Sequence, residues 1–485
     1  MLGYQDSNLE KQDQNLLCYH YTIAQCPFGD AKVELYFSTA KKIPKKIYTF
    51  VHNPFREKRP AKVKQHINRP IMGIKFRLIV MNFLQYAIWG SWLISLGAYL
   101  GGGLQFTGLQ IGSFFATMGI ASLFMPALMG IIADRWIPAQ KLLGICQLIS
   151  AGFLVAAASQ TAYGPLYTCM LMSVMFYMPT IALSNSVAYN ALDLAKLDAV
   201  KHFPPIRVWG TVGFIAAMWF VDLVQIGGVQ IKLTYWQLYV SAILSLILAI
   251  YSFTLPGCPV SHARKSQSWI DTLGLRAFAL FKEKRMAIFF IFSMLLGAAL
   301  QITNAFGDSY IQNFGTMPQY ADSPIVRHSV ILLSLSQMSE TFCILLIPFF
   351  LRRFGIKWVM LISMLAWVLR FGFFGIGNPG SGAVFLILSM IVYGVAFDFF
   401  NISGSLFVEK ETTPDIRSSA QGVFMIMTNG LGAFFGSYAA GAVVDAFGWP
   451  ESWYIFAGYA LVVAIAFAMV FRYKHKPEEM GVVSH

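Results

Sequence analysis

Long stretches without a charged residue alternate along this chain with short basic turns. Residues 78–133 contain no Asp, Glu, Lys, Arg or His, and neither do residues 142–192. A transmembrane helix needs about 20 apolar residues, so each stretch is long enough for two helices. The stretches are apolar throughout, whereas the strands of a membrane barrel would alternate with a period of two. The pattern therefore predicts an all-α membrane protein.

Twelve transmembrane helices are expected from Met72 onward. The loops on one side, counted with the C-terminal tail and the basic start at Lys75 and Arg77, carry 20 Lys and Arg residues. The loops on the other side carry only Lys232 and Arg327. Because cytoplasmic loops are enriched in Lys and Arg, both ends of the chain are expected to be cytoplasmic. The predicted helices cover residues 76–100, 109–133, 139–160, 164–192, 207–227, 236–255, 286–314, 327–351, 357–376, 383–407, 418–446 and 452–472.

The longest hydrophilic segment inside this region, residues 256–285, divides it into two halves. Residues 72–255 and residues 286–476 are each expected to form a bundle of six helices, and residues 477–485 a cytoplasmic tail. The dividing segment is expected to be a cytoplasmic linker. Within it, residues 269–285 are expected to form an amphipathic helix on the inner membrane surface.

A short sequence pattern is also repeated in the two halves. Tyr177 and Asn185 in the fourth predicted helix recur as Tyr393 and Asn401 in the tenth, at the same spacing of eight. A parallel repeat of two six-helix halves is the architecture of a secondary transporter, whose binding site lies near the membrane midplane between the halves.

The first 71 residues differ from the rest of the chain. They contain no apolar segment of the kind found in a signal peptide, and the part from Lys41 to Arg69 is basic and interrupted by prolines. Two explanations are open: a disordered, basic cytoplasmic extension, or a start-site artefact with translation beginning at Met72. In either case no packed domain is expected there.

Composition narrows the function classes. Hydrophobic residues make up 56% of the chain and charged residues 12%, against about 25% charged in soluble domains. This excludes an ordinary soluble enzyme, a secreted disulfide scaffold and a disordered protein. The net charge of +13 reports membrane topology, so no nucleic-acid partner is expected.

The short motifs point away from enzymatic chemistry. Residues 375–380 satisfy GxGxxG but fall in a turn between two predicted membrane helices, where the strand and helix of a dinucleotide site are missing. The chain has no P-loop and no HExxH, and its six cysteines are scattered without a CxxC pair. We therefore expect neither an enzyme nor a metal site, and no ATP-driven pump.

Four ionisable residues are expected inside the membrane: Arg207, Glu340, Arg370 and Asp398. An Arg or Asp at the centre of a membrane helix costs at least about 2.5 kcal/mol, so such residues line a cavity or pair with one another. A static ion pair that fixes helix packing is the alternative. It is favoured for Arg370, whose neighbours are aromatic core residues.

Polar and aromatic residues share helix faces with three of these charges. The combination of amides, carboxylates, a guanidinium and rings suits a neutral, polar solute with a flat part, because amides match polar edges and rings stack on planes. Carboxyl groups in such a cavity are candidate proton sites, here Asp398 and Glu340. The residues so placed are Arg207, Thr211 and Phe214, then Gln301 and Asn304, then Gln337 and Glu340, and finally Tyr393, Phe397 and Asp398.

With these residues in view, the sequence closely resembles the bacterial nucleoside permeases, the nucleoside:proton symporter family of the major facilitator superfamily. The resemblance runs from Met72 to the C-terminus. It is found in FLQYAIWGSWL (83–93), FMPALMGIIADRW (124–136), FPPIRVWGTVGF (203–214), KRMAIFFIFSMLLGAALQITN (284–304), SQMSETF (336–342) and LSMIVYGVAFDFFNISGSLFVEKE (388–411).

The resemblance implies a substrate site and a gate. The ten residues on the four helices match the family's nucleoside pocket without a departure. The turn GIIADRW resembles the inner-gate motif of the superfamily, in which Asp134 and Arg135 would help to close the inner side. Trp136 stands where a glycine is often found, so that match is partial.

The resemblance also implies a function: uptake of purine and pyrimidine nucleosides across the bacterial cytoplasmic (inner) membrane, driven by protons and performed by rocking of the two halves. Protons are then the coupling ion and no cofactor is expected. The partners are the nucleoside and the lipid bilayer, and the protein is expected to be a monomer. Two alternatives stay open: transport of another neutral polar solute, such as a sugar, and a receptor that binds a nucleoside without moving it.

Overall fold

The computed structural model describes residues 71–258, 275–413 and 416–473, which are largely helical. The N-terminal extension (1–71), apart from Ile71, and the tail (477–485) lie outside the described residues. Of the predicted amphipathic helix at 269–285, the described part from Leu275 to Lys282 forms a 3₁₀ helix rather than an α-helix.

The first half of the chain forms six long helices and a small hairpin. The hairpin pairs β1 (Gln225–Ile226) with β2 (Val229–Gln230), and a 3₁₀ turn (Ile231–Leu233) follows it. The helices are α3 (Ile71–Gly90), the short α4 (Leu96–Ala98) with its π-helical continuation (Tyr99–Gly103), α5 (Gly108–Arg135), α6 (Ala139–Ala158), α7 (Tyr163–Leu194), α8 (Ala199–Leu223) and α9 (Trp236–Ser252).

The second half is likewise helical. A 3₁₀ turn (Phe314–Thr316) ends its first helix, and a π-helical stretch (Ile426–Gly432) separates two later ones. The helices are α11 (Lys284–Asn313), the short α12 (Pro324–Arg327), α13 (Ser329–Ile376), α14 (Ala383–Glu411), α15 (Arg417–Met425), α16 (Ala433–Phe447) and α17 (Glu451–Val470).

Within the described residues, nine helices are long and apolar enough to cross a membrane, against twelve predicted. The difference has local causes. The predicted helices 327–351 and 357–376 run together as α13, whose only non-helical residue is Gly355 (φ 76°, ψ 171°), a conformation that glycine adopts at no steric cost. The α9 helix has 17 residues, and the first predicted helix is interrupted by a turn after Gly90. The chain is an all-helical, multi-pass membrane protein.

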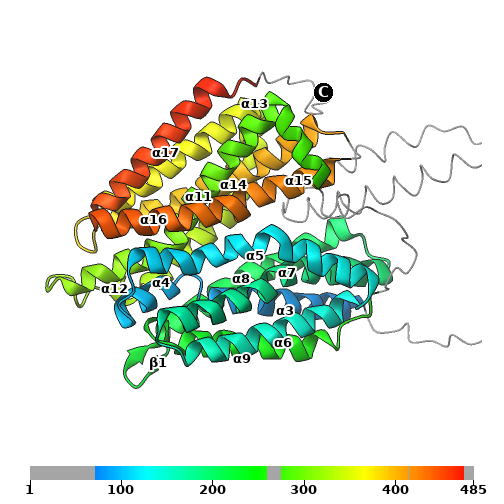
Figure 1. The fold of residues 1–485 in the computed structure, drawn as a ribbon, viewed down its shortest axis with the longest axis horizontal. Coiled ribbons are helices and arrows are strands. Elements are labelled where there is room, and N and C mark those ends of the chain that lie inside the picture. Colours follow the sequence, from blue (N-terminus) through cyan, green and yellow to red (C-terminus); the bar gives the residue numbers. More distant parts are fainter. Residues whose placement is uncertain (1–70, 259–274, 414–415, 474–485) are drawn as a thin grey trace, which may run out of the picture.

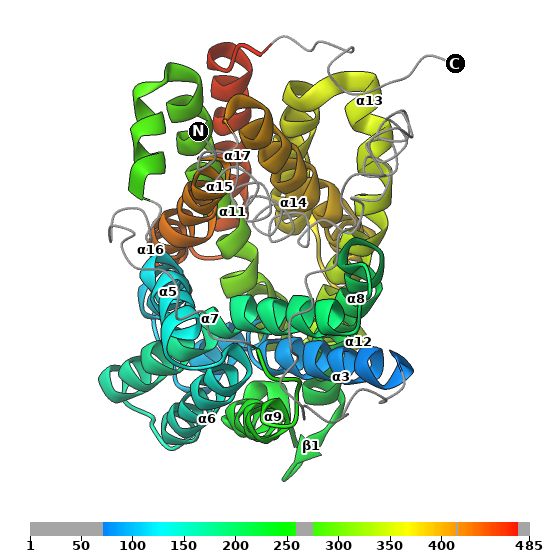
Figure 2. The same ribbon diagram turned by 90° about the vertical axis from the view of Figure 1, so that its right-hand side faces the viewer.

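The helices form two bundles that follow the two halves of the sequence (Figure 1). In the first bundle α3 packs on α8, and α6 packs on α7 and α9. In the second bundle α13 packs on α14 and α17. The bundles meet where α5 packs on α16, α8 on α13 and α4 on α11, and Figure 2 shows the same division from the side. The predicted domain bounds at residues 256–285 stay a prediction, since residues 259–274 lie outside the described part of the chain.

Polar contacts join the bundles at one end of the molecule, the end that carries β1, β2 and α12 and that we call the hairpin end (Figure 1, left). The Leu109 backbone N–H, in the first turn of α5, donates to Asp445 Oδ2 of α16 at 2.7 Å. Trp219 Nε1 of α8 donates to Ser334 Oγ of α13 at 2.9 Å. A carboxylate at a helix N-terminus is favourable because it complements the helix dipole. These contacts hold the hairpin end closed.

The close approach of α5 and α16 depends on glycine. A Cβ atom added at Gly112 would lie 2.2 Å from the Ser437 carbonyl oxygen, across the bundle boundary. We expect Gly112→Ala to lower the free energy of unfolding by about 1–3 kcal/mol, the usual effect of overpacking. Thermal unfolding of the purified protein measures this effect. Gly130→Ala on the same helix is the control, because nothing lies within 4 Å of its added Cβ, and an unchanged melting temperature for Gly112→Ala would contradict the prediction.

Candidate functional site

The ten predicted site residues come from both bundles. Arg207, Thr211 and Phe214 lie on α8 of the first bundle, and the others lie on α11, α13 and α14 of the second. Because α8 packs on α13, the structure brings Arg207 and Glu340 into electrostatic interaction across the boundary. This pair of predicted site residues therefore lies at the boundary between the two bundles, and the substrate-binding role of the ten residues stays a prediction.

Arg207 is held by an aromatic ring that the sequence analysis did not include. Its guanidinium carbon lies 3.9 Å from the centroid of the Tyr86 ring on α3. A cation over an aromatic face is attracted by the ring quadrupole. The Arg207 side chain is only partly buried, so its guanidinium is positioned by Tyr86 and is still accessible to a solute.

Glu340 is the centre of the charges in the site. It interacts electrostatically with Arg207, with Tyr393 and with the second carboxyl group, Asp398. Asp398 is 4% exposed, and its Oδ2 atom has no hydrogen-bond partner in the protein. Two carboxyl groups at close quarters in a low-dielectric site do not both ionise readily, so the pair is suited to hold a proton.

Other buried polar atoms on the helices that carry the predicted site and Tyr86 also lack a hydrogen-bond partner. Among the described residues they include Gln337 Oε1 on α13 and Trp89 Nε1 on α3. Buried polar groups in native proteins are nearly always hydrogen-bonded, so an unpartnered atom such as Gln337 Oε1, one turn from Glu340, is open to a ligand. Gln301 and Asn304 lie one turn apart on α11, with the Asn304 amide donating to Gln301 Oε1 at 3.5 Å. The amides thus offer both donors and acceptors.

Aromatic rings form two walls. On α14 the rings of Tyr393 and Phe397 are parallel, with an interplanar angle of 3° and centroids 5.8 Å apart. Trp367 of α13 meets Tyr393 edge-on at 6.0 Å. On the first bundle Phe214 meets Trp89 edge-on at 6.4 Å. Flat rings on both bundles suit a flat solute.

Arg370 supports this wall from behind. It is 2% exposed, its Nη1 donates to the Ser389 carbonyl oxygen at 2.8 Å, and its guanidinium carbon lies 4.3 Å from the Tyr393 ring centroid. Arg370 is therefore a packing residue that fixes Tyr393, and the contacts seen for it are hydrogen bonds and rings rather than the ion pair expected from the sequence.

A small cavity of about 20 Å³ opens beside Phe397, enough for about one water molecule. Asn401, Thr428 and Asn429, which line it, were not among the predicted site residues. Thr428 and Asn429 lie in the π-helical stretch of the eleventh predicted helix, and π-helical turns occur frequently at functional sites. The full lining is Leu296, Gly297, Leu300, Trp367, Ala396, Phe397, Phe400, Asn401, Thr428 and Asn429.

The sequence analysis missed two buried carboxyl groups and misjudged one cation. Asp222 and Asp308 fall inside the predicted helices 207–227 and 286–314 and are 0% and 1% exposed. Lys232 was counted as an outer loop charge but is fully buried. The sequence could have identified the two aspartates as buried charges, because each is a carboxylate within an apolar segment. The predicted gate residues Asp134 and Arg135 lie at the C-terminal end of α5. Their gating role stays a prediction.

Two helical bundles with unsatisfied polar groups and rings between them define a membrane transporter for a polar solute. Residues 72–476 match the sequence profile of the nucleoside H⁺ symporter family. The chain belongs to this family.

Individual relatives agree with the family assignment. The xanthosine permease of Escherichia coli is 53% identical over 416 residues, which is 84% of this chain and 98% of the permease. The nucleoside permease NupG of the same organism is 51% identical over 423 residues, 85% of this chain and all of NupG. A crystal structure of NupG superposes with a TM-score of 0.78, at 51% identity, over 83% of this chain and 100% of NupG.

Proposed function

We infer that this protein is a nucleoside:proton symporter, which takes up purine and pyrimidine nucleosides together with protons. The observation that carries this function is the family match over residues 72–476. The wide similarity to a xanthosine permease and to a nucleoside permease supports it. The chain is a transporter rather than an enzyme.

The site geometry supports separate roles for the aromatic and the polar residues of the pocket. The base of the nucleoside lies against the parallel rings of Tyr393 and Phe397, with Phe214 on the opposite bundle. Gln301, Asn304 and Gln337 pair with polar edges of the base and sugar, since each amide can donate and accept. Arg207 and Thr211 complete the site from α8.

In this proposal the proton is bound by side chains of the protein, without a cofactor. Glu340 and Asp398 are neighbouring carboxyl groups, one beside Arg207 and one with an unpartnered oxygen. A proton shared by this pair leaves one negative charge in place of two and so lowers the cost of burying the two carboxyl groups. Binding of nucleoside and proton at one place makes the two movements dependent on each other.

The orientation follows from the charge bias of the loops. We place both termini in the cytoplasm, the hairpin end outside, and the protein in the bacterial inner membrane as a monomer surrounded by lipid. All twelve predicted spans cross in this proposal, α13 supplying two of them. The bundles contact one another at the hairpin end, so the outer side is closed, and rocking of the bundles exposes the site to each side in turn.

Uptake of radiolabelled uridine into proteoliposomes tests the function. We expect accumulation above the outside concentration only when an inward proton gradient is imposed, and we expect excess adenosine to block it. Permeabilised vesicles are the control, since they retain label only if the protein binds nucleoside without moving it. Entry without concentration would indicate a facilitator, and no entry would discard the substrate; either result would overturn the proposal.

A further inference from the structure

Polar residues form a stripe along α11 that extends beyond the nucleoside site. Gln301, Asn304, Asp308 and Gln312 follow one another at intervals of three or four residues, so they lie on one face of the helix. Asp308 lies about 10 Å nearer the hairpin end than Gln301, at 1.5 Å per residue. The stripe thus places a carboxyl group between the nucleoside site and the outer end of the protein.

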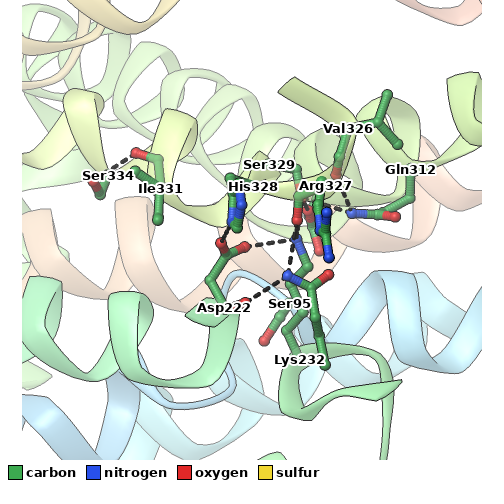
Figure 3. Close-up of polar contacts among 12 residues, drawn as sticks. Ser95, Asp222, Lys232, Gln312, Val326, Arg327, His328, Ser329, Ile331 and Ser334 are labelled. Carbon is green, nitrogen blue, oxygen red and sulfur yellow. Dashed lines mark hydrogen bonds and ion pairs between the residues drawn. The ribbon is translucent and has the colours of Figure 1, made fainter. Parts of the chain in front are cut away.

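Asp308 belongs to a buried charge cluster that joins the two bundles at the hairpin end. Figure 3 shows Asp222, Lys232, His328 and Ser329 of this cluster. Lys232 Nζ lies 2.6 Å from Asp222 Oδ1 and donates to the Arg327 carbonyl oxygen at 2.7 Å and to Ser329 Oγ at 2.9 Å. Ser329 Oγ in turn donates to Asp308 Oδ1 at 2.5 Å. Asp222 and Lys232 come from the first bundle, and the others from the second, so this cluster exists only while the outer side is closed.

The formal charges of this cluster do not balance. Asp222 and Asp308 contribute two negative charges and Lys232 one positive charge, and all three side chains are at most 1% exposed. Two further ionisable residues, Arg327 and His328, adjoin the group. His328 Nδ1 lies 2.7 Å from Asp222 Oδ2 with its side chain 37% exposed, and the Arg327 side chain is exposed to solvent. Burying a net negative charge is costly, and one added proton makes the buried core neutral.

The hydrogen bonds favour Asp308 as the acceptor of that proton. Both oxygens of Asp222 already face cationic or proton-donating partners, Lys232 and His328. Asp308 Oδ2 accepts no well-formed hydrogen bond from the described residues although it is buried, and the Gln312 side chain is the further polar group that interacts with this carboxyl. A protonated Asp308 removes one buried negative charge and leaves the Lys232–Asp222 ion pair intact.

Water can approach this cluster from the outer side. A polar cavity of about 590 Å³ at the hairpin end is lined in part by Gln230, Gln312 and Arg327. The Gln312 amide donates to Ser329 Oγ at 2.7 Å, and Ser329 is the hydrogen-bond partner of Asp308. Only two side chains therefore separate the cavity from the carboxyl group.

We propose that Asp308 is a further proton-binding residue of transport, which takes up one proton from the outside as the outer side closes. The inference rests on the proposed function and adds a second proton site to it, distinct from Glu340 and Asp398. The step forms one O–H bond on Asp308 Oδ2 from a proton of the outer water, and breaks the same bond when the proton leaves. Closure of the outer side thus depends on the outer proton concentration.

Asp308→Asn in proteoliposomes tests this inference, because the amide has the shape of the protonated acid but cannot release a proton. With the membrane potential held at zero and a gradient of one pH unit, one coupled proton supports a tenfold accumulation of nucleoside. We expect Asp308→Asn to lower the uridine accumulation ratio about tenfold and the proton-to-nucleoside stoichiometry by one. Exchange of internal for external uridine and the affinity for uridine stay at the wild-type level, and Asp308→Glu restores accumulation.

Two controls separate this role from others. Glu451→Gln removes an exposed carboxylate at the start of α17 and leaves accumulation unchanged. His328→Gln tests whether the proton resides on the imidazole: we expect it to keep proton-driven accumulation. If His328→Gln loses accumulation while exchange persists, the assignment to Asp308 is wrong even if Asp308→Asn does not fold.

Further outcomes of Asp308→Asn are decisive. Accumulation at the wild-type level overturns the inference and leaves the symport function standing. Loss of exchange and accumulation together in a folded variant shows a structural role and also overturns it. Failure of wild-type protein to accumulate uridine overturns the function itself, so the two failures are distinguishable.

Discussion

Asp398→Asn is expected to abolish proton-driven accumulation of uridine and to weaken uridine binding at least tenfold. The carboxyl group is 4% exposed, its Oδ2 atom is unpartnered, and it faces Glu340. The substitution removes both a proton site and an acceptor for the solute. Losing a hydrogen bond to a charged group costs about 1.5–3 kcal/mol, which corresponds to about 10–150-fold in affinity. Uptake into proteoliposomes and equilibrium binding of uridine measure the two effects.

Glu340→Gln is the companion variant, and it is expected to lose accumulation as well. Arg207 then keeps its position over Tyr86 but loses its acidic neighbour. Asp193→Asn, which alters an exposed residue at the end of α7, is the matched control and should transport normally. Wild-type accumulation by Asp398→Asn and Glu340→Gln would remove both from the proton pathway, and the site assignment with them.

Lys232→Met is expected to give the largest loss of stability among substitutions at the hairpin end. Lys232 and Asp222 are both fully buried, and the variant leaves Asp222 without its cation. Removal of one partner from a buried ion pair costs about 3–5 kcal/mol. Denaturation of the purified protein measures the loss. The double variant Lys232→Met/Asp222→Leu should recover much of it, since replacing both partners by apolar groups is nearly neutral.

The same variant should also shift the protein towards an outward-open form, because Lys232 contacts Arg327 and Ser329 of the other bundle only when the hairpin end is closed. A cysteine at Ser334, which is buried beneath Trp219, reports this opening. Labelling of Ser334→Cys by a membrane-impermeant maleimide should be at least tenfold faster in the Lys232→Met background. Equal labelling rates would show that the cluster does not hold the outer side closed.

The sequence was sufficient to predict a membrane transporter because a lipid bilayer restricts which segments can cross it. A helix that crosses the membrane must be apolar over about 20 residues, and this leaves a pattern that local inspection detects. The same pattern and the family resemblance also led to the predicted division at residues 256–285 and to the predicted site residues on α8 and α14, which stay predictions. The expected loop at 352–356 is reduced to a kink at Gly355, whose φ of 76° separates two helices within α13.

The partners of the polar residues were decided by tertiary structure. Lys232 lies in a loop by sequence, yet packing of the bundles buries it among Asp222, Ser329 and the Arg327 carbonyl group. Nothing in the local sequence brings Asp308 to this place, because its neighbours come from segments about 20 to 90 residues away. The sequence alone established a membrane transporter with charges inside its helices, since apolar length and charge position are local properties. Which charges bind substrate, which close the outer side and which are free to hold a proton depends on distances between helices, and those exist only once the two bundles have packed.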